Sequence, residues 1–346
     1  MKPWPIPSWR PTRGIAGLTV AMAAVVLLSV SASPVRARTS AAGGCSLVNL
    51  RACLPTTTKA PATTTSTVAS IPPPPPGCAN QQTLLADGTR WTCTFDTEFT
   101  GTSYDRTQWV PITTAGSGFT SGKTACFVNS PNNISVGNGY LSLTARKEAA
   151  PFTCQDPRGN FQTQETSGQL STYGLFSQAY GRFEINAAVP SSAVKGLQTS
   201  LWLFPQNEIK YGGWPASGEI DIAEIYSQYP TLAIPYIHYN VNSLATNKRT
   251  NTNTVTNTAC TITPGVFHDY VVEWTPTEIT MIYDGTSCLT DHWVPLPPLH
   301  APQPFDQPFF INLTQALGIS PNTYNAATTP LPATTEVRYV RVWKLG

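Results

Sequence analysis

The sequence predicts an all-β protein folded as a two-sheet antiparallel sandwich. Short runs of Val, Ile, Tyr, Thr and Phe recur between Gly, Pro and Asn residues, as in strands joined by turns. No long segment places apolar residues at the 3.6-residue spacing of a helix. No repeat of fixed length is present either, which favours a sandwich over a propeller.

The predicted strands follow one another from Phe95 to the C-terminus. Residues 140–145 alternate apolar and polar side chains, as a half-buried strand does. The polar tract 247–258 is expected to be a long surface loop. The other strands are expected at 95–99, 180–186, 196–204, 219–225, 237–240, 270–274, 279–284, 309–313 and 337–343.

Residues 1–37 are expected to be a signal peptide. Lys2, Arg10 and Arg13 give a positive start, residues 14–35 carry no charge, and small residues follow around Ala37. An uncleaved membrane anchor is the alternative, because the apolar span approaches the roughly 20 residues that cross a bilayer. Either reading exports the rest of the chain, so we expect a secreted, extracellular or cell-envelope protein that has no membrane contact after cleavage.

The export segment is followed by a linker and one domain. Residues 38–77 contain Thr runs and five successive prolines at 72–76, a composition typical of an extended spacer or of disordered filler. Residues 78–346 are then expected to form one globular unit of roughly 270 residues, a size that single β sandwiches reach.

Eight cysteines agree with export. An even number of cysteines in an oxidising compartment indicates disulfides. A zinc site is disfavoured, because the sequence contains no Cys-x-x-Cys pair. Pairing of neighbours along the chain would close local loops at Cys45–Cys53, Cys78–Cys93, Cys126–Cys154 and Cys260–Cys288.

The charge composition argues against a nucleic-acid partner. The net charge is +2, charged residues make up only 12% of the chain, and no Lys/Arg-rich stripe occurs. A neutral polymer or small molecule is the better expectation.

Three carboxylates crowd into six residues, at Glu219, Asp221 and Glu224, although the chain has only 19 Asp and Glu in all. Like charges held this close shift one another's pKa. Such crowding is typical of a site for catalysis or for a metal.

The spacing of these acids predicts an irregular strand. Side chains alternate along a strand, so Glu219 and Asp221 share one face while Ile220 and Ile222 share the other. Glu224 would fall on the wrong face unless one extra residue, a β-bulge near Ala223, restores it and returns Ile225 to the core.

Two carboxylates on one face suit a retaining glycosidase, which places its nucleophile and its acid about 5–5.5 Å apart. A calcium site and a solvated acidic strand are the alternatives that the spacing leaves open. Calcium prefers carboxylates and carbonyl groups from a flexible loop, which this Ile-rich strand supplies poorly.

The carboxylate strand resembles glycoside hydrolase family 16 in its bulged, laminarinase-type form. The motif Glu-Ile-Asp-Ile-Ala-Glu begins at Glu219 and follows Trp-Pro-Ala-Ser-Gly, which begins at Trp214. Similar segments occur in the same order at 180–184, 267–270, 273–276, 283–285 and 339–343.

The resemblance implies a concanavalin A-like β-jelly roll with a substrate cleft on its concave face, in a catalytic domain at 78–346. It implies retaining hydrolysis of internal β-1,3 or mixed-linkage glucan bonds, with Glu219 as nucleophile, Asp221 as its assisting carboxylate and Glu224 as general acid/base. We expect a monomer that acts on β-glucan polysaccharide and uses no cofactor or metal.

Four other residues are candidate substrate-binding residues. Trp214 is expected either to stack on a sugar ring or to cap the sandwich edge, and Trp202 to lie on the cleft floor or in the core. His238 would face the cleft by the resemblance, although a lone strand His is more often structural. Asn133, in a segment that resembles an early strand of the family, is expected to hydrogen-bond sugar hydroxyls.

Several positions depart from the family pattern. Gln198-Thr199-Ser200 replaces a usual Trp-Pro-Ala, Gln169 replaces an Arg, residues 314–318 differ from a usual Asn-Leu-Ala-Val-Gly-Gly, and Arg338 replaces an Asp often used for a structural calcium. The first three changes leave the glucan linkage open, so another β-linked polymer (mixed-linkage glucan or galactan) is an alternative substrate. Transglycosylation is a second alternative, because a covalent glycosyl intermediate can pass to a sugar. A non-catalytic glucan-binding protein is a third, which the intact Glu219 and Glu224 disfavour.

Overall fold

The computed structural model describes residues 77–78, 90–122, 124–242, 249–251 and 253–345. The predicted signal peptide and nearly all of the predicted linker lie outside these residues. Eighteen strands and one short α-helix, α1 (Thr114–Ser117), make up the regular structure of the described chain. Within these ranges, no helix combines the length and apolar character needed to span a membrane.

One sheet is built on β18, which pairs with β8 along one edge and with β6 and then β1 along the other. Beyond β8 the order continues through β14, β15 and β16, and β5 pairs with the outer edge of β6. The bounds of these strands are β1 (Trp91–Thr97), β5 (Ile134–Gly137), β6 (Tyr140–Cys154), β8 (Gly181–Ala188), β14 (Phe267–Trp274), β15 (Ile279–Tyr283), β16 (Thr286–Asp291) and β18 (Ala333–Leu345).

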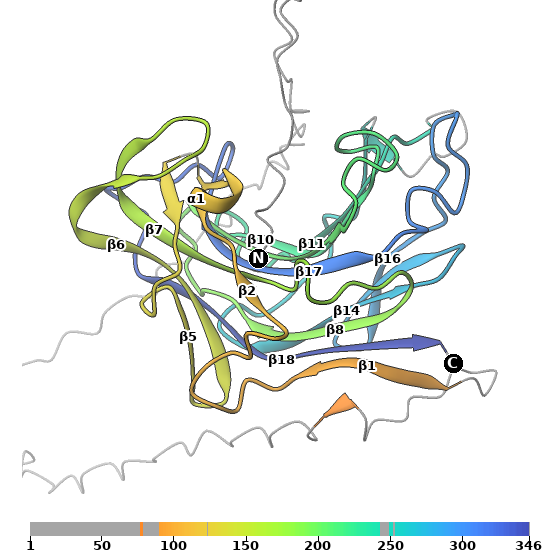
Figure 1. Ribbon diagram of the computed structural model, residues 1–346, viewed down its shortest axis with the longest axis horizontal. Coiled ribbons are helices and arrows are strands. Elements are labelled where there is room, and N and C mark those ends of the chain that lie inside the picture. The colour runs from red at the N-terminus through yellow and green to blue at the C-terminus, as the bar shows by residue number, and fades with distance from the viewer. Residues whose placement is uncertain (1–76, 79–89, 123, 243–248, 252, 346) are drawn as a thin grey trace, which may run out of the picture. The chain divides into compact units, whose positions relative to one another are not determined.

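The other sheet has the order β2-β7-β17-β9-β10-β11-β13-β12. Figure 1 shows β10, β11 and β17 in a layer above β8, β14 and β18. The long strands β6 and β7 join the two sheets, and β3 and β4 add to this junction. The bounds are β2 (Val110–Pro111), β3 (Thr120–Ser121), β4 (Ala125–Phe127), β7 (Phe161–Ser171), β9 (Leu197–Pro205), β10 (Glu219–Tyr226), β11 (Ile234–His238), β12 (Arg249–Asn251), β13 (Thr254–Thr256) and β17 (Phe309–Leu317).

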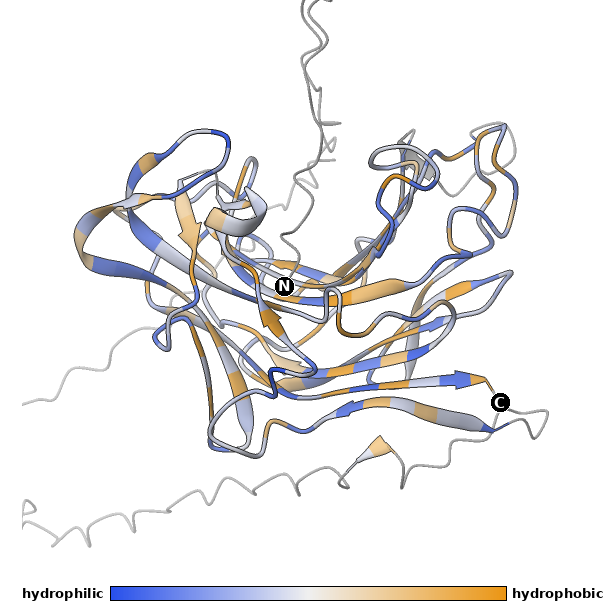
Figure 2. Cartoon of the chain, in the orientation of Figure 1, coloured by the Kyte–Doolittle hydropathy of each residue, from blue (hydrophilic) through white to orange (hydrophobic). Residues whose placement is uncertain are grey.

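This architecture confirms the predicted all-β antiparallel sandwich. Among the described strands, β4 with β7 is the parallel pair. The core lies between the layers, and Figure 2 shows apolar and polar residues alternating along their strands. Side chains from both sheets fill it, including Phe183, Ile185, Leu201, Leu203, Ile220 and Val340.

Three of the four predicted disulfides are present. Cys78–Cys93, Cys126–Cys154 and Cys260–Cys288 have Cα–Cα separations of 5.7, 5.8 and 5.8 Å, as disulfide geometry requires. The predicted pair Cys45–Cys53 lies outside the described residues.

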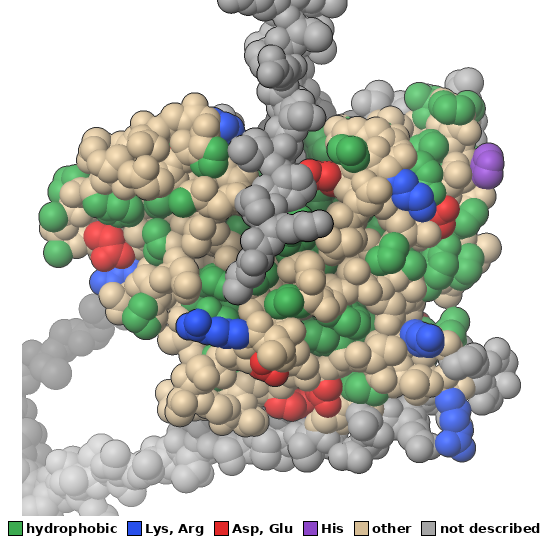
Figure 3. Space-filling view, viewed as in Figure 1, with side chains coloured by type: hydrophobic (Ala, Val, Ile, Leu, Met, Phe, Trp, Pro, Cys, Tyr) green, Lys and Arg blue, Asp and Glu red, His purple; other side chains and the backbone are tan. Residues whose placement is uncertain are grey.

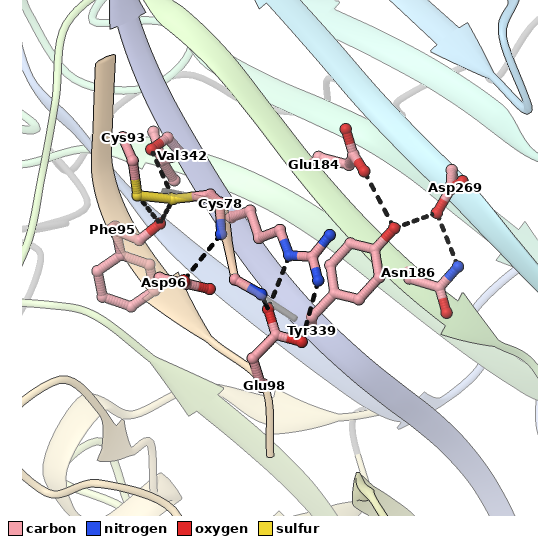
Figure 4. Close-up of polar contacts among 12 residues, drawn as sticks. Cys78, Cys93, Phe95, Asp96, Glu98, Glu184, Asn186, Asp269, Tyr339 and Val342 are labelled. Atoms are coloured by element: carbon pink, nitrogen blue, oxygen red, sulfur yellow. Dashed lines mark hydrogen bonds and ion pairs between the residues drawn. A yellow bond between two sulfur atoms is a disulfide. The ribbon is translucent and has the colours of Figure 1, made fainter. Parts of the chain in front are cut away.

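Polar contacts fasten the first sheet along β18 (Figure 4). The guanidinium of Arg341 is fully buried and its Nε lies 2.7 Å from Oε1 of Glu98. Two residues earlier on the strand, the Tyr339 hydroxyl lies 3.0 Å from Glu184 and 2.7 Å from Asp269. These contacts tie β18 to β8, to β14 and to the segment after β1.

The expectation of a long loop at 247–258 is wrong, because β12 and β13 lie within this tract. β13 pairs with β11 from Thr254 opposite His238 to Thr256 opposite Tyr236. An available strand edge outweighs the polar composition, and Thr itself is a favourable strand residue.

Candidate functional site

The carboxylate strand is β10, and it carries the predicted bulge. Opposite β9, Asp221 pairs with Trp202 and Ala223 pairs with Leu201, so Ile222 is the extra residue. The same shift appears opposite β11, between Asp221 and Glu224. Ile220, Ile222 and Ile225 are buried while Glu219 and Glu224 keep partial exposure, as the spacing predicts.

Glu219, at the start of β10, contacts the loop that precedes it. The indole N–H of Trp214 donates a hydrogen bond of 2.5 Å to Oε2 of Glu219. The Trp214 side chain is 53% exposed and its ring centroid lies 5.4 Å from that of His238. Trp214 therefore covers the Glu219 carboxylate while presenting an aromatic surface to solvent.

The loop that carries Trp214 is held at two points. The hydroxyl of Tyr211 donates to both carboxylate oxygens of Asp306, at 2.6 and 2.8 Å. Ser217 accepts from the N–H of Tyr211 and donates to the carbonyl of Gly212, which closes the loop on itself.

Asp221 lies between the two glutamates and is only 4% exposed. Its Oδ2 is 3.3 Å from Nε2 of His238, which is the residue of β11 paired with Glu219. Nδ1 of His238 lies 3.0 Å from the hydroxyl of Thr254 on β13. His238 is thus held by a strand on each side and faces the carboxylates.

Both carboxylate oxygens of Glu224 accept hydrogen bonds. Oε1 accepts from Nε2 of Gln198 at 2.7 Å and from the Ser200 hydroxyl at 2.9 Å. Oε2 accepts from the Tyr226 hydroxyl, two residues further along β10. Gln198 and Ser200 belong to the segment of β9 in which the sequence departs from the family pattern.

Burial raises the pKa of Glu219 to about 8, and the charge of Asp221 is the second cause, whereas His238 and the Trp214 N–H act in the opposite direction. Burial followed by the charge of Glu224 raises the pKa of Asp221 well above its usual value. Because the pKa values of both Glu219 and Asp221 are raised, we expect this pair to retain a proton at neutral pH.

Glu219, Asp221 and His238 also form a group that could hold a metal ion, since one ligand atom from each lies within 4.8 Å of the others. In the protein, however, these side chains already pair with one another, with Trp214 and with Thr254. These contacts give each of the three side chains a protein partner, so none of them requires an ion.

The two remaining candidate residues lie in different surroundings. Trp202, opposite Asp221 on the same face of the sheet, is partly exposed and donates to the Thr314 hydroxyl at 3.0 Å. This places it on the site side of the sheet. Asn133 is fully buried and its amide donates to Thr144 and Thr166. The prediction that Asn133 contacts sugar is therefore wrong, because its buried amide instead makes hydrogen bonds at the junction of β5, β6 and β7.

Tyr226 and Tyr236 also line the site, although the sequence patterns did not identify them. Tyr226 follows Glu224 by two residues on a strand, so the alternation rule places both on one face and could have identified it. Tyr236 pairs with Asp221 across β10 and β11, and its ring stacks on His238 at 5.6 Å. Only the register of β11 reveals this position.

The charge on the molecular surface is sparse. On the face seen in Figure 3, the described Lys, Arg, Asp and Glu side chains are scattered among uncharged atoms rather than gathered into one patch. Such a surface is suited to an uncharged partner.

Comparisons with known proteins agree with the fold and with the motif. The family model "Glycosyl hydrolases family 16" matches residues 121–292. The glucan endo-1,3-beta-glucosidase A1 of Niallia circulans is 30% identical over 268 residues, which cover 71% of this chain and 37% of that protein. The beta-glucanase of Rhodothermus marinus is 32% identical over 235 residues, which cover 61% of this chain and 70% of that protein.

A solved structure shows the same fold. The endo-beta-1,3-glucanase of Pyrococcus furiosus superposes with a TM-score of 0.60 at 27% identity, over 75% of this chain and 97% of that chain. The chain spans little more than a third of the Niallia protein but over two thirds of the Rhodothermus one. With the bulged carboxylate strand in place, these matches show that the chain belongs to glycosyl hydrolase family 16.

Proposed function

We propose that the protein is a secreted retaining endo-glycosidase that hydrolyses internal β-1,3 linkages of β-glucan by double displacement. The observation that carries this proposal is the bulged strand β10, which brings Glu219, Asp221 and Glu224 to one face and gives each a different set of partners. Distinct surroundings are what allow neighbouring carboxyl groups to take different protonation states.

In the first step, Glu219 attacks the anomeric carbon while Glu224 gives its proton to the departing glycosidic oxygen. Glu219 attacks as the carboxylate, and the Trp214 N–H, which donates to it, opposes the effect of burial and favours this form. Burial raises the pKa of Asp221, so this carboxyl group assists by holding a proton and removing a negative charge from beside the nucleophile.

In the second step, Glu224 acts as a base toward water, and the water oxygen displaces Glu219 from the sugar. The product then keeps the anomeric configuration of the substrate. Trp214, Trp202 and His238 lie on the same side of the sheet as the acids and are proposed to contact the sugar rings, with Trp214 offering the exposed aromatic face.

The test of the mechanism is laminarin hydrolysis, followed by release of reducing ends. We expect Glu219→Gln and Glu224→Gln to lose at least about 100-fold in kcat/KM, since each removes a group that acts in the transition state. Glu278→Gln is the matched control, because Glu278 lies on the surface beside His292. Equal slow release by the wild type and both site variants would refute the enzyme hypothesis.

The linkage and the stereochemistry need separate measurements. Incubation with laminarin, a mixed-linkage glucan and a galactan identifies the substrate, and proton NMR of the first product reports the anomer. Cleavage of only the mixed-linkage glucan or the galactan would overturn the β-1,3 assignment and leave the mechanism standing. Transfer to added oligosaccharide, seen as longer products, would identify a transglycosylase.

A further inference from the structure

We propose that Tyr283, on β15 of the opposite sheet, is a positioning residue that holds the bulge in β10 and so sets where Glu224 lies relative to Glu219. Its hydroxyl donates a hydrogen bond of 2.6 Å to the backbone carbonyl of Ile222, the extra residue of the bulge. This inference deepens the proposed function, because it rests on the assignment of Glu219 and Glu224 as the reacting carboxylates. Tyr283 belongs to the buried core, so it acts through the strand and not on the sugar.

The carbonyl of Ile222 lies outside the regular hydrogen-bond ladder of the described sheet. On β9, the partners of Asp221 and Ala223 are consecutive residues, which leaves Ile222 with no residue opposite it. The register of β11 also passes over Ile222, and Pro235, which lies opposite this interval, has no N–H to donate. A buried carbonyl without a donor costs free energy, so this one needs a donor from elsewhere in the fold.

Tyr283 is held by its own sheet in a position to supply this donor. The backbone register places it opposite Tyr270 on β14 and opposite Thr286 on β16. Its ring meets the ring of Tyr270 edge to face, with the centroids 5.4 Å apart. Both Tyr283 and Ile222 are buried, so water does not compete for the bond. One hydrogen bond across the core thus joins the first sheet to the irregular point of the strand that carries the acids.

The place of this bond within β10 connects it to the geometry of the reaction. Ile222 lies between Asp221 and Glu224, where the register shifts against both neighbouring strands. The conformation at this point brings Glu224 to the face that holds Glu219, and a retaining mechanism needs its two carboxyl groups about 5–5.5 Å apart. A misplacement of about 1 Å can cost about 100-fold in rate. Tyr283 therefore acts on the separation of the two reacting carboxylates, whereas the residues proposed to contact sugar lie in other segments.

The test is Tyr283→Phe, which removes the hydroxyl and keeps the ring. We expect kcat on laminarin to fall about 10-fold, because the bulge carbonyl loses its donor and the strand relaxes around it. We expect KM to stay within about twofold of the wild-type value, because the side chains proposed to bind sugar are unchanged.

Two further Tyr→Phe variants are the matched controls. Tyr270→Phe removes a neighbouring core hydroxyl that has no hydrogen-bond partner among the described residues, and we expect it to keep the wild-type kcat. Tyr339→Phe removes the hydroxyl that bonds Glu184 and Asp269 on the first sheet. We expect this second variant to have a lower melting temperature and the wild-type kcat, which separates a loss of stability from a loss of positioning.

A second readout follows the bond itself and does not depend on activity. Ile followed by Ala occurs in the chain at 15–16 and at 222–223. In an Ile15→Val background labelled with carbon-13 at the isoleucine carbonyl and nitrogen-15 at alanine, the remaining doubly labelled peptide reports on the Ile222 carbonyl. We expect its carbon signal to move upfield in Tyr283→Phe, since a hydrogen bond is lost, and to stay in place in Tyr339→Phe.

The two readouts decide the inference together. A loss of kcat in Tyr283→Phe alone, with the shift of the carbonyl signal, supports it. An unchanged carbonyl signal would overturn it, as would wild-type kcat in a variant whose carbonyl signal has moved, or an equal loss of kcat in Tyr339→Phe. Failure of the wild type to cleave laminarin would instead refute the proposed function, and the carbonyl signal would still decide whether Tyr283 holds the bulge.

Discussion

Glu219 shows at the scale of one residue how function opposes stability. Its carboxyl group is enclosed by protein beside Asp221, which raises its pKa to about 8 from an ordinary value of 4.5. Below pH 4.5 both the folded and the unfolded chain hold the proton. Between pH 4.5 and 8 only the folded chain keeps it, so the folded state loses stability as the pH rises through this window.

Glu219→Gln should therefore stabilise the protein, and more so at alkaline pH. The amide does not titrate, so we expect the melting temperature to exceed that of wild type by roughly 4 °C at pH 8 and to match it near pH 4.5. Differential scanning calorimetry at the two pH values measures this, with Glu278→Gln as the control. A difference in melting temperature that does not depend on pH would show that the titration of Glu219 is not its cause.

At the scale of elements, the site depends on how β10 is framed by its neighbours. The loop before β10 brings Trp214 to Glu219, β11 brings His238 to Asp221, and β9 brings Gln198 and Ser200 to Glu224. The bulge allows the three acids to have different partners, because it shifts the register of β10 against both β9 and β11 between Asp221 and Glu224.

The loop that carries Trp214 gives a prediction at this scale. Tyr211→Phe removes the hydroxyl that bonds Asp306, so the loop should hold Trp214 less firmly over the site. We expect KM for laminarin to rise about 3- to 10-fold with a smaller change in kcat. Lys210→Met is the control: its ammonium lies 3.6 Å from the same carboxylate in an exposed pair, and we expect less than about a twofold effect. Equal effects of the two variants would refute the anchoring role of Tyr211.

At the scale of the whole molecule, Arg341 on β18 stabilises the sheet that does not contain β10, by joining β18 to Glu98 after β1. It is fully buried against Glu98, so Arg341→Met leaves a partly buried carboxylate without its partner. We expect a loss of about 2–4 kcal/mol in the free energy of unfolding, measured with urea. The double variant Arg341→Met/Glu98→Met should recover most of this loss, whereas failure to recover would show that Arg341 acts through packing alone.

Much of this architecture could be predicted from local patterns. The alternation of residues in β6 and β10, the odd spacing of Glu224 and the order of the cysteines each depend on neighbours in the chain. Asn133 and the pair β12–β13 could not be predicted in the same way, because burial at a three-strand junction and pairing with the edge of β11 depend on segments far away in sequence. Tyr236 was missed for the same reason.

The bulge in β10 also bears on how such a site can change over time. The partners of Glu219 and Asp221 lie in the loop before β10 and on β11, whereas those of Glu224 lie on β9 and at the end of β10. Substitutions in one segment can therefore alter the surroundings of one of these two carboxylates and leave those of the other intact. In the proposed mechanism water and sugar acceptors compete in the second step, so variation confined to β9 offers a route from hydrolysis to glycan remodelling that leaves the contacts of Glu219 unchanged.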